Sequence, residues 1–170
     1  MPKKYHNLFA QIQAFEKHVE DLEGRIYQLE KKIEQMIDVE RNHLVRIKNN
    51  EELSDEFILS GRKYQDLSPE KAWKLYCNRD FDFILIDVSD KEFTPEEKLP
   101  EAQSIPWEDF PDRFYEITTK TTPILIISED GTNSVLACEY LAKRGYYNCN
   151  NVSGGYKHWI GFQVPKIRSA

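Results

Sequence analysis

Residues 123–133 read PILIISEDGTN, an apolar run that ends abruptly in a polar loop. The apolar run up to Ile127 predicts a buried strand. The loop 128–133 leads into a helical pattern over 134–144, which Gly145 is expected to close as a C-terminal cap. Ligands of an open parallel sheet bind beyond the carboxyl ends of its strands, so this strand, loop and helix are the expected place for chemistry.

Short apolar runs and helical stretches continue to alternate on both sides of this unit. The alternation predicts an α/β domain over residues 64–166, with a mostly parallel central sheet flanked by helices. Ser68-Pro69 is an N-cap followed by proline at the first helical position, and residues 83–86 form a second buried strand. Further along, an extended piece is expected from residue 105, a helix interrupted near Pro111 over 107–117, and a strand over 147–152.

The first 48 residues carry a different pattern. Apolar residues recur with an unbroken spacing of four and three, which predicts a helix with one apolar seam over residues 5–48. Such a helix is about 65 Å long at 1.5 Å per residue, far longer than the face of a small domain. Most of the seam therefore needs another partner. Its residues are Leu8, Ile12, Phe15, Val19, Leu22, Ile26, Leu29, Ile33 and Met36.

The heptad flanks indicate the orientation of that partner. The seam places β-branched residues mainly at position a and leucine mainly at position d, a combination that favours two parallel strands. Parallel chains set Arg25 against Glu30 and His18 against Glu23 of a second copy, whereas antiparallel chains set like charges together. We therefore expect a parallel homodimeric coiled coil through residues 5–48. A long amphipathic helix folded back on its own domain is the alternative.

The seam weakens after Met36, and residues 49–63 are expected to connect the helix to the domain. Asn49-Asn50 is typical of a helix end. Ser54 is a candidate N-cap for a short helix that ends at Gly61.

Composition limits the class of partner. The chain of 170 residues has a net charge of −6, and residues 51–170 hold fourteen basic and twenty-one acidic residues. An acidic domain argues against nucleic acid as the main partner. No apolar run approaches the roughly 20 residues that span a bilayer, so we expect no membrane contact and a cytoplasmic location. The three cysteines, an odd number with no short spacing, predict neither a disulfide framework nor a zinc site.

Residues 64–166 resemble the rhodanese-like (sulfurtransferase-fold) family. The resemblance covers the whole domain, and the order and spacing of its motifs make it specific. The motifs are Ile84-Leu85-Ile86-Asp87-Val88, Glu92-Phe93, Leu99-Pro100-Glu101-Ala102, Ile105-Pro106, the helix end up to Gly145-Tyr146, Val152-Ser153-Gly154-Gly155-Tyr156, and Trp159.

The resemblance also implies where catalysis occurs in active members. There the loop after the central strand begins with a cysteine that carries a persulfide, held by backbone N–H groups, a helix dipole and positive charge. The aligned residue here is Ser128, whose hydroxyl cannot form a persulfide. Three further loop residues also differ from the pattern of active members. Glu129 and Asp130 bring negative charge, and Asn133 stands where arginine often closes the loop. The degenerate loop is Ser128, Glu129, Asp130, Gly131, Thr132 and Asn133.

The sequence gives weaker support to cysteine nucleophiles and to histidine metal ligands. Cys138 lies in an apolar helical pattern and is expected to be buried. Neither Cys77 nor Cys149 has flanking positive charge to activate it. The histidines of the long helix, His6, His18 and His43, are too far apart to bind one metal, and His158 is expected to pack or cap beside Trp159. We expect no cofactor and no metal.

These patterns predict a catalytically inactive rhodanese-like protein, not an enzyme, that serves as a dimeric protein-interaction or scaffolding module. A sulfurtransferase or persulfide carrier using Cys149 or Cys77, or a hydrolase using Ser128, is the alternative. A third hypothesis keeps the loop as a binder of a small anion, against the charges of Glu129 and Asp130.

Overall fold

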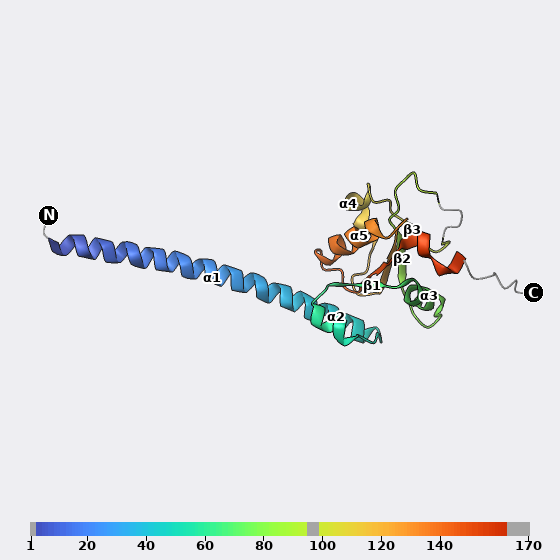
Figure 1. The fold of residues 1–170 in the computed structure, drawn as a ribbon, viewed down its shortest axis with the longest axis horizontal. Coiled ribbons are helices and arrows are strands. Elements are labelled where there is room, and N and C mark those ends of the chain that lie inside the picture. Colours follow the sequence, from blue (N-terminus) through green and yellow to red (C-terminus); the bar gives the residue numbers. More distant parts are fainter. Residues whose placement is uncertain (1–2, 95–98, 163–170) are drawn as a thin grey trace, which may run out of the picture. The chain divides into compact units, whose positions relative to one another are not determined.

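The computed structural model describes residues 3–94 and 99–162, and the chain divides into two units, residues 1–38 and 39–170 (Figure 1). Helix α1 (Lys3–Lys48) confirms the long helix expected from the apolar seam. It ends where Asn50 adopts a left-handed conformation with φ of 60°. Among the described residues, no helix combines the length and the apolar character needed to cross a bilayer.

The second unit is built on a parallel sheet of five strands in the order β1-β5-β4-β2-β3. Ile86 of β2 lies opposite Ile126 of β4, which in turn lies opposite Asn151 of β5. The observed α/β architecture confirms the predicted fold class. The strands are β1 (Tyr64–Leu67), β2 (Ile84–Asp87), β3 (Gln103–Ser104), β4 (Ile124–Ile127) and β5 (Cys149–Val152).

Helices cover both faces of the sheet (Figure 1). They are α2 (Asp55–Ser60), α3 (Pro69–Cys77), α4 (Phe110–Arg113), α5 (Thr132–Ala142) and the 3-10 helices η1 (Phe114–Glu116), η2 (Gly155–His158) and η3 (Ile160–Phe162). The predicted N-caps are confirmed, because the Ser54 and Ser68 side chains accept hydrogen bonds from the N–H groups of Phe57 and Lys71.

The central strand β4 separates two apolar cores. Ile124 and Ile126 pack into the core on the α4 and α5 side, while Leu125 and Ile127 pack into the core that includes Trp159. All four are fully buried. Side chains of a strand alternate between faces, so one short apolar run is buried on both sides.

Several predicted boundaries need correction. The fifth strand begins at Cys149 rather than at residue 147, and the extended piece is β3, two residues before Ile105. The helix expected over 107–117 begins only at Phe110, with Pro111 tolerated in its first turn, and its interruption falls after Arg113, where η1 follows α4. Residues 95–98 and the predicted domain end at 166 lie outside the described residues.

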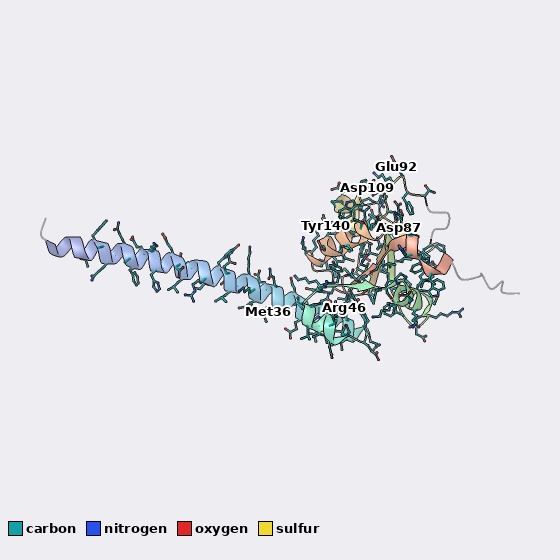
Figure 2. All side chains as sticks on the ribbon, in the orientation of Figure 1. Met36, Arg46, Asp87, Glu92, Asp109 and Tyr140 are labelled. Carbon is teal, nitrogen blue, oxygen red and sulfur yellow. The ribbon has the colours of Figure 1, made fainter. Side chains whose placement is uncertain are left out.

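The end of α1 is joined to the sheet by a buried cation. Arg46, labelled in Figure 2, is fully buried and donates to the carbonyl oxygen of Cys149 at 2.7 Å and to Oδ1 of Asn150 at 2.9 Å. It also donates to Asn42 and forms an ion pair of 2.9 Å with Glu51. Because Cys149 opens β5, the helix end attaches at the amino ends of the strands, opposite the loop that follows β4.

Candidate functional site

The loop 128–133 joins β4 to α5 at the carboxyl end of the central strand. Gly131 occupies the position before the first residue of α5 with φ of 94°, a conformation that favours glycine. A β-carbon at Gly131 would approach the backbone nitrogen of Gly154 to 2.9 Å. The glycine therefore allows both the turn and its close contact with the segment after β5.

The Ser128 side chain points into the loop rather than to solvent. Its exposed fraction is 1%. The N–H groups of Gly131 and Ser134 donate to its Oγ at 3.1 Å and 3.2 Å. Its hydroxyl thereby occupies backbone donors that an anion bound inside the loop would need.

A chain of hydrogen bonds leads from Ser128 into the sheet. The Ser128 hydroxyl donates to Oγ of Ser134 at 3.2 Å, and the Ser134 hydroxyl donates to Oδ1 of Asn151 at 2.6 Å. The amide of Asn151 then donates to Asp66 at 2.9 Å. None of the described groups that bond directly to Ser128 is a general base, so this arrangement does not activate Ser128 as a nucleophile.

The sequence pattern did not predict this chain of contacts. Ser134 and Asn151 are 17 positions apart, and both carry polar side chains that a loop or a strand edge commonly exposes. A signal was nevertheless available. A β5 sequence of Cys-Asn-Asn-Val is unusually polar for a strand that is buried along its whole length.

The two carboxylates of the loop are partly engaged. Lys157 Nζ lies 3.5 Å from Glu129, and Oδ1 of Asp130 accepts from the N–H of Thr132 at 2.9 Å. This backbone hydrogen bond is the main cause of the lowered pKa of Asp130, to which the charge of Lys157 also contributes. Lys157, which the sequence pattern did not single out, therefore lies beside both carboxylates of the loop.

The far end of the loop is bridged to the segment after β2. The Asn133 amide donates to Oδ1 of Asp90 at 2.8 Å. Asn133 stands where the family resemblance places an arginine. It contacts the Asp90 carboxylate through a neutral amide. This leaves no guanidinium to attract an anion at that position.

Backbone contacts from the Ser153-Gly154-Gly155 turn fix the other side of the loop. The N–H groups of Tyr156 and Lys157 donate to the carbonyl oxygens of Ser128 and Glu129 at 2.9 Å and 3.0 Å. A β-carbon on Gly155 would come within 2.0 Å of the Ser128 carbonyl oxygen. Glycine at this position is therefore a condition for the observed loop geometry.

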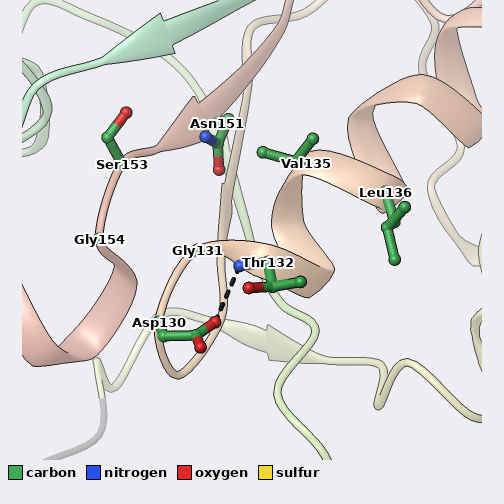
Figure 3. Close-up of a pocket in the computed structure, with 8 residues that line it drawn as sticks. All are labelled: Asp130, Gly131, Thr132, Val135, Leu136, Asn151, Ser153 and Gly154. Atoms are coloured by element: carbon green, nitrogen blue, oxygen red, sulfur yellow. Dashed lines mark hydrogen bonds between the residues drawn. The ribbon is translucent and has the colours of Figure 1, made fainter.

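A hollow of about 460 Å³ lies beside the loop (Figure 3). Its lining combines the loop, the first turns of α5 and the end of β5. The lining residues are Asp130, Gly131, Thr132, Val135, Leu136, Asn151, Ser153 and Gly154.

None of the three cysteines belongs to the loop 128–133. Cys138 and Cys149 are fully buried, and burial raises the pKa of both thiols, that of Cys149 to about 12. The expected burial of Cys138 is confirmed. Cys77, at the end of α3, is exposed. Since thiolates are the reactive form, Cys149 is unsuited to carry a persulfide.

Histidines do not form a ligand set in the described chain. His43 packs edge-on against Phe57 with ring centroids 5.4 Å apart, and His158 contacts the carbonyl oxygen of Gly154 at 3.2 Å. No group of three metal-ligating side chains occurs among the described residues.

The predicted seam residues lie on α1 with their side chains exposed in the single chain. Their exposed fractions run from 36% for Val19 to 71% for Met36. A large apolar residue every third or fourth position therefore forms an uncovered stripe. Beyond the last seam residue, Met36, the side chains of His43 and Arg46 contact Phe57 of α2.

Comparison with known proteins supports the fold at the level of sequence. A family model described as rhodanese-like domain matches residues 68–161. YtwF of Bacillus subtilis (strain 168), whose name makes it a candidate sulfurtransferase, is 33% identical over 95 residues, covering 56% of this chain and 90% of that protein. The thiosulfate sulfurtransferase GlpE of Glaesserella parasuis is 21% identical over 102 residues, covering 60% and 92% of the two chains.

Solved structures agree with the fold. A rhodanese-like domain protein from Staphylococcus aureus superposes with a TM-score of 0.50 at 24% identity, covering 56% of this chain and 90% of that one. The solution structure of a rhodanese-like domain from Anabaena gives a TM-score of 0.50 at 19% identity, covering 62% and 84%. At these identities the similarity extends to the fold alone.

Proposed function

The chain belongs to the rhodanese-like domain family, and from this premise we propose that it is a non-catalytic member that acts as a protein-interaction module. The buried Ser128 hydroxyl is the observation that carries the proposal. It stands where the family resemblance places the nucleophile, its Oγ accepts from two loop N–H groups, and it lacks sulfur. A hydroxyl in this setting has neither the acidity nor the base needed to attack a sulfur donor.

The proposal includes pairing with a second copy through the seam of α1. A stripe of nine exposed apolar residues on one helix supports it, because each copy would cover the stripe of the other. The flanking charges support the parallel orientation, in which basic g positions face glutamates at e. Two domains carried by one dimer would give a bivalent partner two contacts and raise its avidity.

Sulfur transfer through another cysteine is the second candidate. The names of YtwF and GlpE favour it, and Cys77 is an exposed thiol in this chain. The burial and raised pKa of Cys149 argue against that residue as the carrier. Cys77 also lies at the carboxyl end of α3 and not at a helix N-terminus like the one that follows the loop 128–133.

An assay of sulfur transfer from thiosulfate to cyanide separates the two candidates. We expect the full-length protein to show no turnover above buffer. Mass spectrometry after incubation with thiosulfate should show no added sulfur atom on any cysteine. Turnover that disappears in Cys77→Ser, or an added sulfur atom on Cys77, would refute the non-catalytic assignment.

Two matched variants make a negative result informative. Ser128→Cys places a thiol in the same loop, and Ser128→Ala removes the hydroxyl. Thiosulfate turnover by the native chain that is lost in Ser128→Ala would contradict the non-catalytic assignment. The carboxylates of Glu129 and Asp130 raise the pKa of a nearby thiol, so Ser128→Cys is expected to transfer sulfur poorly.

A further inference from the structure

The hollow beside the loop has an apolar floor. Val135 and Leu136, on consecutive positions of α5, supply it, and Leu136 is 41% exposed. Figure 3 shows both side chains on the first turns of the helix, with Asp130 at the edge formed by the loop. At about 460 Å³ the hollow has the volume of a small ligand pocket, and it is large enough to accept an aliphatic side chain and its neighbour.

Its walls are held in place before any ligand arrives. Both ends of the Asn151 amide are bonded, one to Ser134 and the other to Asp66. Gly154 contributes backbone with φ of 75°, and a β-carbon there would come within 2.6 Å of His158. Little ordering of the protein is therefore needed for binding, which favours affinity.

Carboxylates flank the floor. Asp130 lines the hollow directly, and Glu139 is exposed one helical turn beyond Val135 and Leu136. Positive charge nearby is already paired: Arg62 contacts Asp66 at 3.1 Å, and Lys157 contacts Glu129. These ion pairs offset the charges of Asp66 and Glu129 and leave the carboxylates of Asp130 and Glu139.

We propose that this hollow binds a peptide segment of another protein in which an aliphatic side chain stands next to a lysine or arginine. The aliphatic side chain would rest on Val135 and Leu136, and the cation would face Asp130. Charge complementarity selects this partner over an acidic one. The inference rests on the proposed role as an interaction module and specifies the chemistry of its partner.

Fluorescence anisotropy tests the proposal with the full-length protein. The probe is a fluorescein-labelled peptide of sequence GLKLKG, and GLELEG is the matched acidic peptide. We expect saturable binding of the lysine peptide, binding at least about tenfold weaker for the glutamate peptide, and loss of affinity as salt is raised. Absence of binding, or equal binding of both peptides, would overturn the proposal.

Paired variants locate the binding. Leu136→Ser removes part of the floor, and Asp130→Asn removes a charge while keeping an oxygen that can accept from Thr132. Each is expected to weaken binding by about fivefold or more. Leu59→Ser and Asp82→Asn change an exposed leucine and an exposed aspartate outside the hollow and should leave affinity unchanged. Equal effects of the two pairs would place the peptide elsewhere and overturn the assignment.

Different results would overturn the proposed binding site and the proposed function on which it rests. If the protein neither transfers sulfur nor binds the lysine peptide, the hollow is not the proposed binding site. The non-catalytic role stands in that case. Sulfur turnover would overturn that role whatever the peptide does.

Discussion

At the scale of one residue, Ser128 contributes stability as an acceptor inside the loop. Ser128→Ala leaves the N–H groups of Gly131 and Ser134 without this acceptor in a buried setting. We expect the free energy of unfolding to fall by about 1–3 kcal/mol. Urea denaturation followed by tryptophan fluorescence measures it, since all three tryptophans lie within residues 39–170.

Ser153→Ala is the control for that loss. The Ser153 side chain is only partly buried and lies at the hollow rather than inside the loop. Its removal should cost less than about 0.5 kcal/mol. Equal losses for the two alanine variants would mean that the Ser128 contacts add no stability of their own.

At the scale of an element, the end of α1 depends on Arg46. Arg46→Ala removes donors from Glu51, Asn150 and the Cys149 carbonyl oxygen. Burial lowers the pKa of Arg46 and Glu51 opposes the shift, as expected for a desolvated cation with a partner. Breaking a buried pair is costly, so we expect a loss of about 3–5 kcal/mol in the same denaturation experiment.

Arg62→Ala provides the matched surface substitution. Arg62 pairs with Asp66 while 61% of its side chain is exposed. Because water screens such pairs, the expected loss is at most about 1 kcal/mol. A larger loss in Arg62→Ala than in Arg46→Ala would contradict the assignment of Arg46 as the main attachment.

At the scale of the whole molecule, the proposed dimer makes two measurable predictions about mass. Sedimentation equilibrium should give twice the chain mass for the native protein. It should give the monomer mass for Ile26→Asp, because the substitution places two carboxylates in the apolar seam. A monomeric native protein would refute the pairing.

Cross-linking tests the parallel orientation of the same dimer. In a Cys77→Ser background, Phe15→Cys puts two thiols at facing d positions of a parallel pair and should oxidise to a covalent dimer. Lys17→Cys places them on the outer face and should not. Cross-linking at neither position in a protein of dimeric mass would favour antiparallel chains.

Short-range sequence patterns predicted much of the secondary structure. The length of α1, the caps at Ser54 and Ser68, and the strands around Ile86 and Ile126 follow from periodicity and capping chemistry within a few residues. Strand β1 was not predicted, because Tyr-Gln-Asp-Leu has one fully buried residue and forms by pairing with β5.

The candidate site was only partly predictable. The family resemblance placed the loop 128–133, and the charge pattern placed its carboxylates. The contacts of Ser134 with Asn151, and of Arg46 with β5, join positions 17 and 103 or more apart. The polar sequence of β5 marks one member of these pairs, but a single sequence does not indicate which distant residue is its partner. An arginine near a helix end ordinarily lies in water.

The amino and carboxyl ends of the parallel strands have different neighbours. The starts of the strands receive Arg46 and Asn42, while the finish of the central strand presents Ser128 and its neighbours. The residues that contact the end of α1 and the residues that line the hollow therefore have no side chain in common. A variant changed at the strand starts can serve as the reference for the hollow, and a variant changed at the hollow can serve as the reference for the strand starts.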